Sequence, residues 1–231
     1  MVLDDSAGFL ATLNFAFLLS FPSLFAIINP IGAAFIFDGV AKDFTTAERK
    51  KVAARVSVYS LLIIFGALWG GAYVLSIFGV SLEALRIAGG VVVAVSAWRL
   101  LTAEDRRADR KSHGTLAATG ETRIDPLQLA FFPLALPFTT GPGTIAVAIT
   151  LGAERPDGAG FLAFFVGESL AAVTNAVIIW IAYRSSDRVA GSMGPATRLV
   201  IARLSAFLLM CIGAQILISA VGDLVIKWRC A

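Results

Sequence analysis

Charged residues are scarce in this chain, and their scarcity decides its class. Only 15% of the 231 residues are Asp, Glu, Lys or Arg, whereas about a quarter are charged in a typical soluble domain. Hydrophobic residues make up 58%, and the mean hydropathy is +0.82. A water-soluble fold of this length has too little interior to bury so much apolar surface. The composition therefore excludes a soluble globular domain and indicates a protein of the lipid bilayer.

Residues that bind metals or form disulfides are equally scarce. The chain has two cysteines, Cys211 and Cys230, in no CxxC arrangement, and one histidine, His113, in a polar stretch. It has no phosphate-binding glycine loop, no nucleophile elbow and no carboxylate pair with a histidine base. The sequence therefore predicts no metal site, no cofactor and no enzymatic activity. Its basic residues form no amphipathic stripe with aromatics, which argues against nucleic-acid binding.

Six apolar segments are long enough to cross a membrane, which takes about 20 helical residues. The predicted spans are 9–37, 52–80, 83–101, 126–151, 160–183 and 199–225. The third is the weakest, because Arg86 and Arg99 leave only a short uncharged run between them. Residues 1–6 contain no Lys or Arg, unlike the start of a cleavable signal peptide, so we expect the first span to be retained.

The Lys and Arg residues choose between two orientations, because cytoplasmic loops carry the excess of these residues. With the N-terminus outside, the inner connections hold thirteen: Lys42, Arg49, Lys50, Lys51, Arg99, Arg106, Arg107, Arg110, Lys111, Arg123, Arg184, Arg188 and Arg198. The outer segments hold three, which are Arg155, Lys227 and Arg229. The bias predicts that both termini face outward and that residues 102–125 form a cytoplasmic linker.

Two proline signals divide the chain into similar halves. In each half, a Phe-Pro pair is followed eight or nine residues later by a proline beside glycine or asparagine. The copies are Phe21-Pro22 with Asn29-Pro30-Ile31-Gly32, and Phe132-Pro133 with Gly141-Pro142-Gly143, offset by 111 to 112 residues. Three spans on each side of the linker must insert with opposite orientations. We therefore predict an all-α polytopic membrane protein of two inverted three-helix repeats, 1–101 and 126–231, each with a broken first helix.

Broken helices at corresponding positions point to a transporter's central site, because freed backbone groups and helix ends can bind a solute there. The predicted substrate-binding residues are Asn29, Pro30, Gly32, Thr139, Thr140, Gly141, Pro142, Gly143 and Thr144. The alternative is that these prolines only kink packed helices, which membrane proteins tolerate. The pairs Gly70-Gly71 and Gly89-Gly90 are interpreted as close-packing positions instead.

Four further polar residues inside the spans are candidates for gating or coupling. Arg86 and Arg203 occupy similar places in the third span of each half, where they either clamp a carboxylate or extend to the membrane surface, with Glu83 as a helix partner of Arg86. Glu168 lies in an apolar run with Asn175 two turns later on the same face. This pattern favours proton coupling or recognition of an amino group, and the alternative is an interfacial carboxylate.

Several of these motifs together resemble one family. At Asn29-Pro30-Ile31-Gly32, Arg86-Ile87-Ala88-Gly89-Gly90, Pro133-Leu134-Ala135-Leu136-Pro137 and Gly141-Pro142-Gly143-Thr144-Ile145, the sequence resembles the MarC family of bacterial and archaeal membrane proteins. The resemblance implies six spans and a relation to LysE-type exporters. It also implies transport of small neutral amino acids such as alanine and glycine, as described for some members. Thr139 and Thr140 depart from the apolar or small residues expected before Gly-Pro-Gly.

These observations lead to one functional hypothesis and its rivals. We expect a secondary transporter in the cytoplasmic (inner) membrane that moves a small neutral amino acid or similar zwitterion, coupled to a proton or sodium ion. The rivals are an exporter or channel for another small solute or drug, and a non-transporting membrane subunit. The sequence permits a homo-oligomer and does not specify one.

Overall fold

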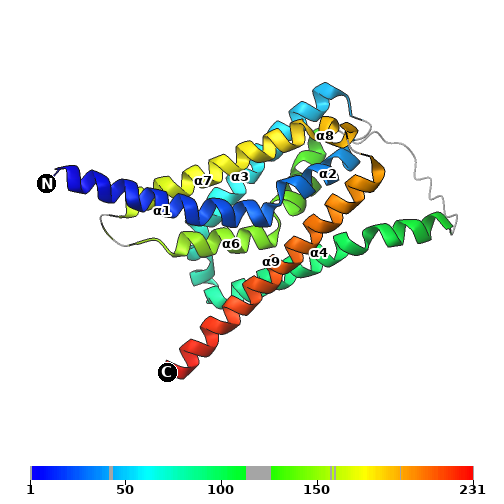
Figure 1. Ribbon diagram of the computed structural model, residues 1–231. Helices are drawn as coiled ribbons and strands as arrows, with labels where there is room; N and C mark the ends of the chain where they lie inside the picture. The colour runs from blue at the N-terminus through cyan, green and yellow to red at the C-terminus, as the bar shows by residue number, and fades with distance from the viewer. Residues whose placement is uncertain are drawn as a thin grey trace.

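The computed structural model describes residues 2–41, 44–112, 126–156, 158, 160–192 and 194–230. Within these ranges the regular structure is entirely helical, and no residue lies in a β-strand. The elements are α1 (Val2–Ile28), α2 (Pro30–Val40), α3 (Thr46–Ile77), α4 (Leu82–Ser112), α5 (Pro126–Leu129), the π-helix η1 (Ala130–Thr139), α6 (Pro142–Ala153), α7 (Phe161–Arg184), α8 (Ser186–Ser192) and α9 (Pro195–Cys230). Figure 1 shows their arrangement.

Each predicted span corresponds to a helical segment. Five segments are long and apolar enough to cross a membrane, and a bent pair, Pro126–Thr139 with Pro142–Ala153, makes a sixth if it counts as one span. Large apolar side chains such as Leu18, Ile77 and Leu208 are exposed on the outer surface, as lipid-facing residues are. The all-helical membrane class is therefore confirmed.

The structure departs from the predicted boundaries in two connections. The prediction assigned residues 102–125 to a linker, but α4 continues as a helix to Ser112. Alanine, glutamate and arginine, which favour helix, are frequent after residue 101, so α4 continues beyond its apolar segment. The short α8 in the connection before α9 was not predicted, because seven mostly polar residues carry no usable periodicity. Residues 113–125, including His113, lie outside the described part of the chain.

The helices of the two halves pack in a reciprocal pattern. In the first half, α1 contacts α7, the second long helix of the other half. In the second half, the broken first span, η1 and α6, contacts α3 in the same way. The third helices, α4 and α9, contact each other most extensively and cross the remaining helices obliquely (Figure 1). Both chain ends lie toward the same end of the bundle, away from α8 (Figure 1).

Glycines set the closest helix contacts. A Cβ at Gly71 would overlap Ile149 of α6, and one at Gly89 would reach Ala146 of the same helix. A Cβ at Gly90 would lie 3.0 Å from the backbone oxygen of Gly213 on α9. The packing interpretation of these three glycines is confirmed. It is wrong for Gly70, where a Cβ would meet nothing within 4 Å.

Candidate functional site

The first break lies where the sequence placed it. Asn29 separates α1 from α2 with φ 47° and ψ 64°, a left-handed conformation that asparagine tolerates better than most residues. Its side-chain oxygen accepts a hydrogen bond from Gly32 N at 3.2 Å, and Pro30 has no N–H that needs a partner. A Cβ at Gly32 would lie 2.6 Å from Asn29 Nδ2. The local sequence therefore explains both the interruption and its cap.

The second break occurs in the fourth span and is much sharper. Phe132 and Leu136 leave the helical conformation, and each precedes a proline, which disfavours helix in the residue before it. At Gly141 the chain is extended, and the axes of the two helical pieces differ by 66°. A Cβ at Gly141 would lie 2.7 Å from Pro137 O. The predicted interruption is thus found in both halves.

Two buried threonines stabilise this second break. Thr139 Oγ1 donates to Leu134 O at 2.7 Å, and Thr140 Oγ1 donates to Ala135 O at 2.8 Å. The hydroxyls of Thr139 and Tyr183 are 2.6 Å apart, and Tyr183 stacks on Phe37 of α2 with ring centroids 4.7 Å apart. The hydroxyl groups of Thr139 and Thr140 therefore donate to backbone oxygens of the irregular turn and stabilise it. Their predicted contact with substrate stays a prediction.

The two breaks lie next to each other in space. A Cβ at Gly143, just after the second break, would overlap Val93 of α4 and lie 3.4 Å from Ile27 Cδ1, just before the first. Asn29 Nδ2 donates to Ser205 O of α9 at 3.4 Å. Helices α1, α4, α6 and α9 therefore converge near the irregular backbone.

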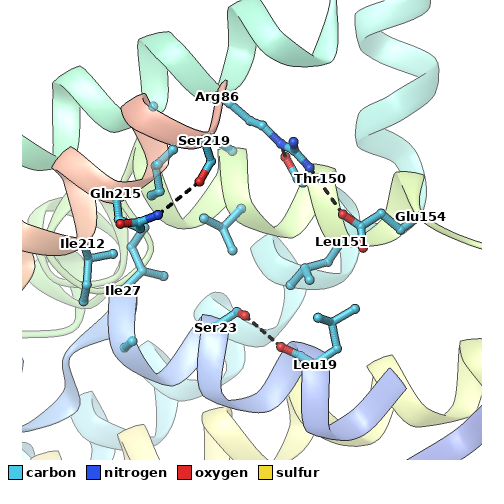
Figure 2. Close-up of a pocket in the computed structure, with 15 residues that line it drawn as sticks. Leu19, Ser23, Ile27, Arg86, Thr150, Leu151, Glu154, Ile212, Gln215 and Ser219 are labelled. Atoms are coloured by element: carbon cyan, nitrogen blue, oxygen red, sulfur yellow. Dashed lines mark hydrogen bonds and ion pairs between the residues drawn. The ribbon is translucent and has the colours of Figure 1, made fainter. Parts of the chain in front are cut away.

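A cavity of about 340 Å³ lies between these same four helices (Figure 2). Its walls are mainly apolar, with polar side chains at intervals. The lining residues are Leu19, Ser23, Ala26, Ile27, Arg86, Gly89, Ala146, Val147, Thr150, Leu151, Glu154, Ile212, Gln215, Ile216 and Ser219. Both halves of the chain contribute to it.

Arg86 forms the charged end of this cavity. Its guanidinium contacts Glu154 Oε1, just after α6, at 3.3 Å, and its Nε donates to Thr150 Oγ1 of α6 at 3.3 Å (Figure 2). It also contacts Asp223 Oδ2 of α9 at 2.9 Å. The predicted helix partner Glu83 pairs instead with Lys227. Packing of α4 against α6 brings Glu154 to Arg86, and packing of α4 against α9 brings Asp223, whereas Glu83, one turn away on α4, pairs elsewhere. Arg86 therefore ties three helices together.

The other predicted site residues do not line the cavity. None of the predicted substrate-binding residues from Asn29 to Thr144 is in its lining, which instead includes Ile27, two residues before Asn29, and Ala146, four residues after Pro142. Arg203 is exposed on α9 and is not part of the lining, so the structure separates it from Arg86. The residues that sequence reasoning missed are Ser23, Thr150, Glu154, Gln215, Ser219 and Asp223. Their only signal was a lone polar side chain in or beside an apolar span.

Glu168 and Asn175 lie on the face of α7 that packs against α1. Glu168 is fully buried, and its Oε1 accepts from Ser20 Oγ at 3.2 Å, whereas Oε2 has no hydrogen-bond partner among the described residues. Asn175 donates to Phe21 O at 3.3 Å and to Ala171 O at 2.9 Å, and its Oδ1 is likewise unpartnered. The shared face is confirmed. Burial inside the bundle also places Glu168 away from the lipid-facing surface.

The geometry so far describes a helical membrane protein with two broken spans around a small polar-ended cavity, and the comparisons agree with that class. The profile described as MarC family integral membrane protein matches residues 14–225. The chain belongs to the MarC family. The expectation from the sequence motifs is thereby confirmed.

The relatives of this MarC family member carry a name that states a location. Proteins named inner membrane protein MarC are 34% identical over 209 residues in Salmonella paratyphi A and 33% identical over 205 residues in Citrobacter koseri and in Escherichia coli. Each alignment covers 87% of this chain and 92% of the relative. No solved structure matches the chain significantly.

Proposed function

We propose that the protein is a secondary transporter that moves a small neutral amino acid, or a similar zwitterion, across the cytoplasmic membrane. One observation carries this proposal: a cavity of about 340 Å³ between the two halves, with an arginine and a carboxylate at one end. Small-molecule sites span roughly 300–1,000 Å³. The volume lies at the low end of that range and suits a ligand of few heavy atoms.

The charges at the cavity end match the two ends of a zwitterion. The planar guanidinium of Arg86 suits a carboxylate, and Glu154 beside it suits an ammonium group. A zwitterion would replace the ion pair between Arg86 and Glu154 with two ion pairs, one at each of its own charges, and would leave the net charge of the cavity unchanged. An anion alone would take Arg86 from Glu154 and leave that carboxylate without its counterion, which is unfavourable in an apolar cavity.

The breaks supply the movement that transport requires. Ile27 lines the cavity two residues before Asn29, and Ala146 lines it five residues after Gly141, so a change in bend at either break reshapes the cavity walls. Arg86, bound to Glu154 and Asp223, holds α4, α6 and α9 together at one end and acts there as a gate. The reciprocal packing of the two halves supports an inverted repeat, in which the cavity opens to each side in turn.

The test is solute counterflow in liposomes containing the purified protein, because exchange does not depend on the transport direction or the coupling ion. Liposomes loaded with unlabelled alanine should accumulate external labelled alanine, and empty liposomes should not. Alaninol, which lacks the carboxylate, and lactate, which lacks the amino group, should compete poorly. Arg86→Gln should lower the apparent affinity for alanine about tenfold or more, because a hydrogen bond between charged groups is lost.

The matched control is Arg155→Gln. Arg155 lies at the same end of the bundle and contacts Tyr73, but it does not line the cavity. Its counterflow should remain close to that of the unmodified protein. Absence of counterflow with any small zwitterion would contradict the proposal. Competition by alaninol and lactate as strong as that by unlabelled alanine would also contradict it.

A further inference from the structure

A second cavity, of about 360 Å³, lies where α3 begins and α7 ends. Figure 1 shows these helix ends near α8. Its lining is strongly basic. The residues are Thr46 and Lys50 from α3, Trp180, Ile181 and Arg184 from α7, and Ser185, Asp187 and Arg188 at the junction with α8. The transport proposal does not use this cavity.

The helical spacing directs these side chains to one place. Thr46 and Lys50 are four residues apart and share a face of α3. Trp180 and Arg184 are four residues apart on the facing side of α7, and Arg188 lies just beyond the end of α7, in α8. Three cations from three elements, α3, α7 and α8, therefore converge on a single cavity.

These cations have no anionic partner within the part of the chain that the structure describes. No ion pair involves Lys50, Arg184 or Arg188, although Arg49, Arg86 and Lys227 are all paired. Arg184 lies over the ring of Trp180, 5.0 Å from its centroid. The single carboxylate in the lining, Asp187, accepts from the backbone N–H of Arg188 at 2.8 Å. Three cations against one carboxylate leave an excess of positive charge.

The cavity lies at the depth of lipid headgroups. At 1.5 Å per residue, the 24 residues of α7 exceed the roughly 30 Å of bilayer hydrocarbon, so Arg184 in its last turn reaches the polar region. Trp180 lies one turn deeper, where tryptophans are enriched at membrane interfaces. Ile181, which also lines the cavity, is 52% exposed and offers an apolar surface to an acyl chain.

We propose that this cavity binds the phosphate group of an anionic phospholipid. Lys50, Arg184 and Arg188 contact the phosphate oxygens, Arg through its paired N–H groups, while Ile181 packs against the first part of an acyl chain. In the proposed topology this end faces the cytoplasm, where basic residues near the membrane meet anionic lipid. The site is separate from the transport cavity, and its failure would leave the transport proposal untouched.

Native mass spectrometry of the purified protein in detergent, with equimolar phosphatidylglycerol and phosphatidylcholine, measures the preference directly. The unmodified protein should retain phosphatidylglycerol preferentially. Each of Lys50→Gln, Arg184→Gln and Arg188→Gln should lower the ratio of bound phosphatidylglycerol to phosphatidylcholine about fivefold. Asp187→Asn removes the carboxylate and should raise the ratio, a gain that an unfolded variant would not show.

The control is Lys51→Gln, which removes an exposed cation of α3 beside Lys50 that is absent from the cavity lining. Its lipid ratio should match that of the unmodified protein. An equal drop in Lys51→Gln would show a general charge effect and overturn the site. The preference for phosphatidylglycerol is also measured in millimolar inorganic phosphate and in chloride of equal ionic strength. If phosphate abolishes the preference and chloride does not, the cavity binds soluble phosphate and the lipid assignment is overturned.

Discussion

Glu168 combines complete burial with an oxygen that has no partner. Ser20 donates to one carboxylate oxygen, and the other has no hydrogen-bond partner in the part of the chain that the structure describes. A buried carboxylate in its ionised form requires a cation or further hydrogen bonds. We therefore propose that Glu168 carries a proton in this state and exchanges it during transport, which would couple solute movement to a proton gradient.

Glu168→Gln should separate exchange from accumulation. The amide keeps the size and the hydrogen bond from Ser20 but cannot release a proton, so alanine counterflow should persist while accumulation driven by a pH gradient is lost. Both are measured in the same proteoliposomes. Glu83→Gln, a carboxylate at the helix start paired with Lys227, should retain both activities. Accumulation in Glu168→Gln at the normal level, with an unchanged pH profile, would remove Glu168 from the coupling mechanism.

Thr139 and Tyr183 share one hydroxyl contact, so the losses of stability caused by the two single substitutions should overlap. Thr139→Val leaves the buried Tyr183 hydroxyl without its acceptor, which should lower the free energy of unfolding by about 1–3 kcal/mol. Tyr183→Phe should cost less, because Thr139 Oγ1 keeps Leu134 O as its acceptor. Unfolding in a detergent titration measures each variant.

The variant with both substitutions, Thr139→Val and Tyr183→Phe, completes a double-mutant cycle. Its loss of stability should be smaller than the sum of the two single losses by about 0.5 kcal/mol or more, as expected for residues in contact. Strict additivity would mean that the hydroxyl pair does not stabilise the break in the fourth span.

At the scale of elements, Gly152 allows the backbones of α3 and α6 to approach each other closely. A Cβ at Gly152 would overlap the backbone oxygen of Leu68, and a backbone atom cannot rotate away as a side chain can. Gly152→Ala should therefore force the helices apart and lower the melting temperature in detergent. The overpacking of buried sites typically costs about 1–3 kcal/mol.

Gly70→Ala is the matched control in the same contact region, since its Cβ would meet open space. Alanine favours helix by roughly 0.8–1.0 kcal/mol over glycine, so this variant should be unchanged or slightly more stable. A destabilisation of Gly70→Ala equal to that of Gly152→Ala would contradict the packing seen between α3 and α6.

At the scale of the molecule, the orientation in the membrane remains a proposal drawn from thirteen inner against three outer basic residues. In cells, a cysteine at position 112, on a background without Cys211 and Cys230, should react with an impermeant thiol reagent only after the membrane is opened. A cysteine at position 229 should react in intact cells. Labelling of position 112 in intact cells would overturn the N-out, C-out topology.

The sequence by itself determined the spans and both breaks. Hydropathy over about 20 residues identifies a segment whose backbone must be helical in lipid, whatever it packs against. The breaks are equally local, because Pro30 and Pro142 lack an N–H, and Asn29 and Gly141 adopt conformations that interrupt a helix. Family membership followed from the same motifs, and the profile match confirmed it.

Only the tertiary structure decided which polar side chains meet. The partners of Arg86 are 68 and 137 residues away, and nothing near Arg86 in the sequence identifies Glu154 or Asp223 in preference to Glu83. The same holds for the lining of the cavity and for the burial of Glu168 against Ser20. In a soluble protein an amphipathic pattern marks the buried face of each helix. In a membrane, lipid and protein interior are both apolar, so the pattern is weak and helix packing alone selects the partners.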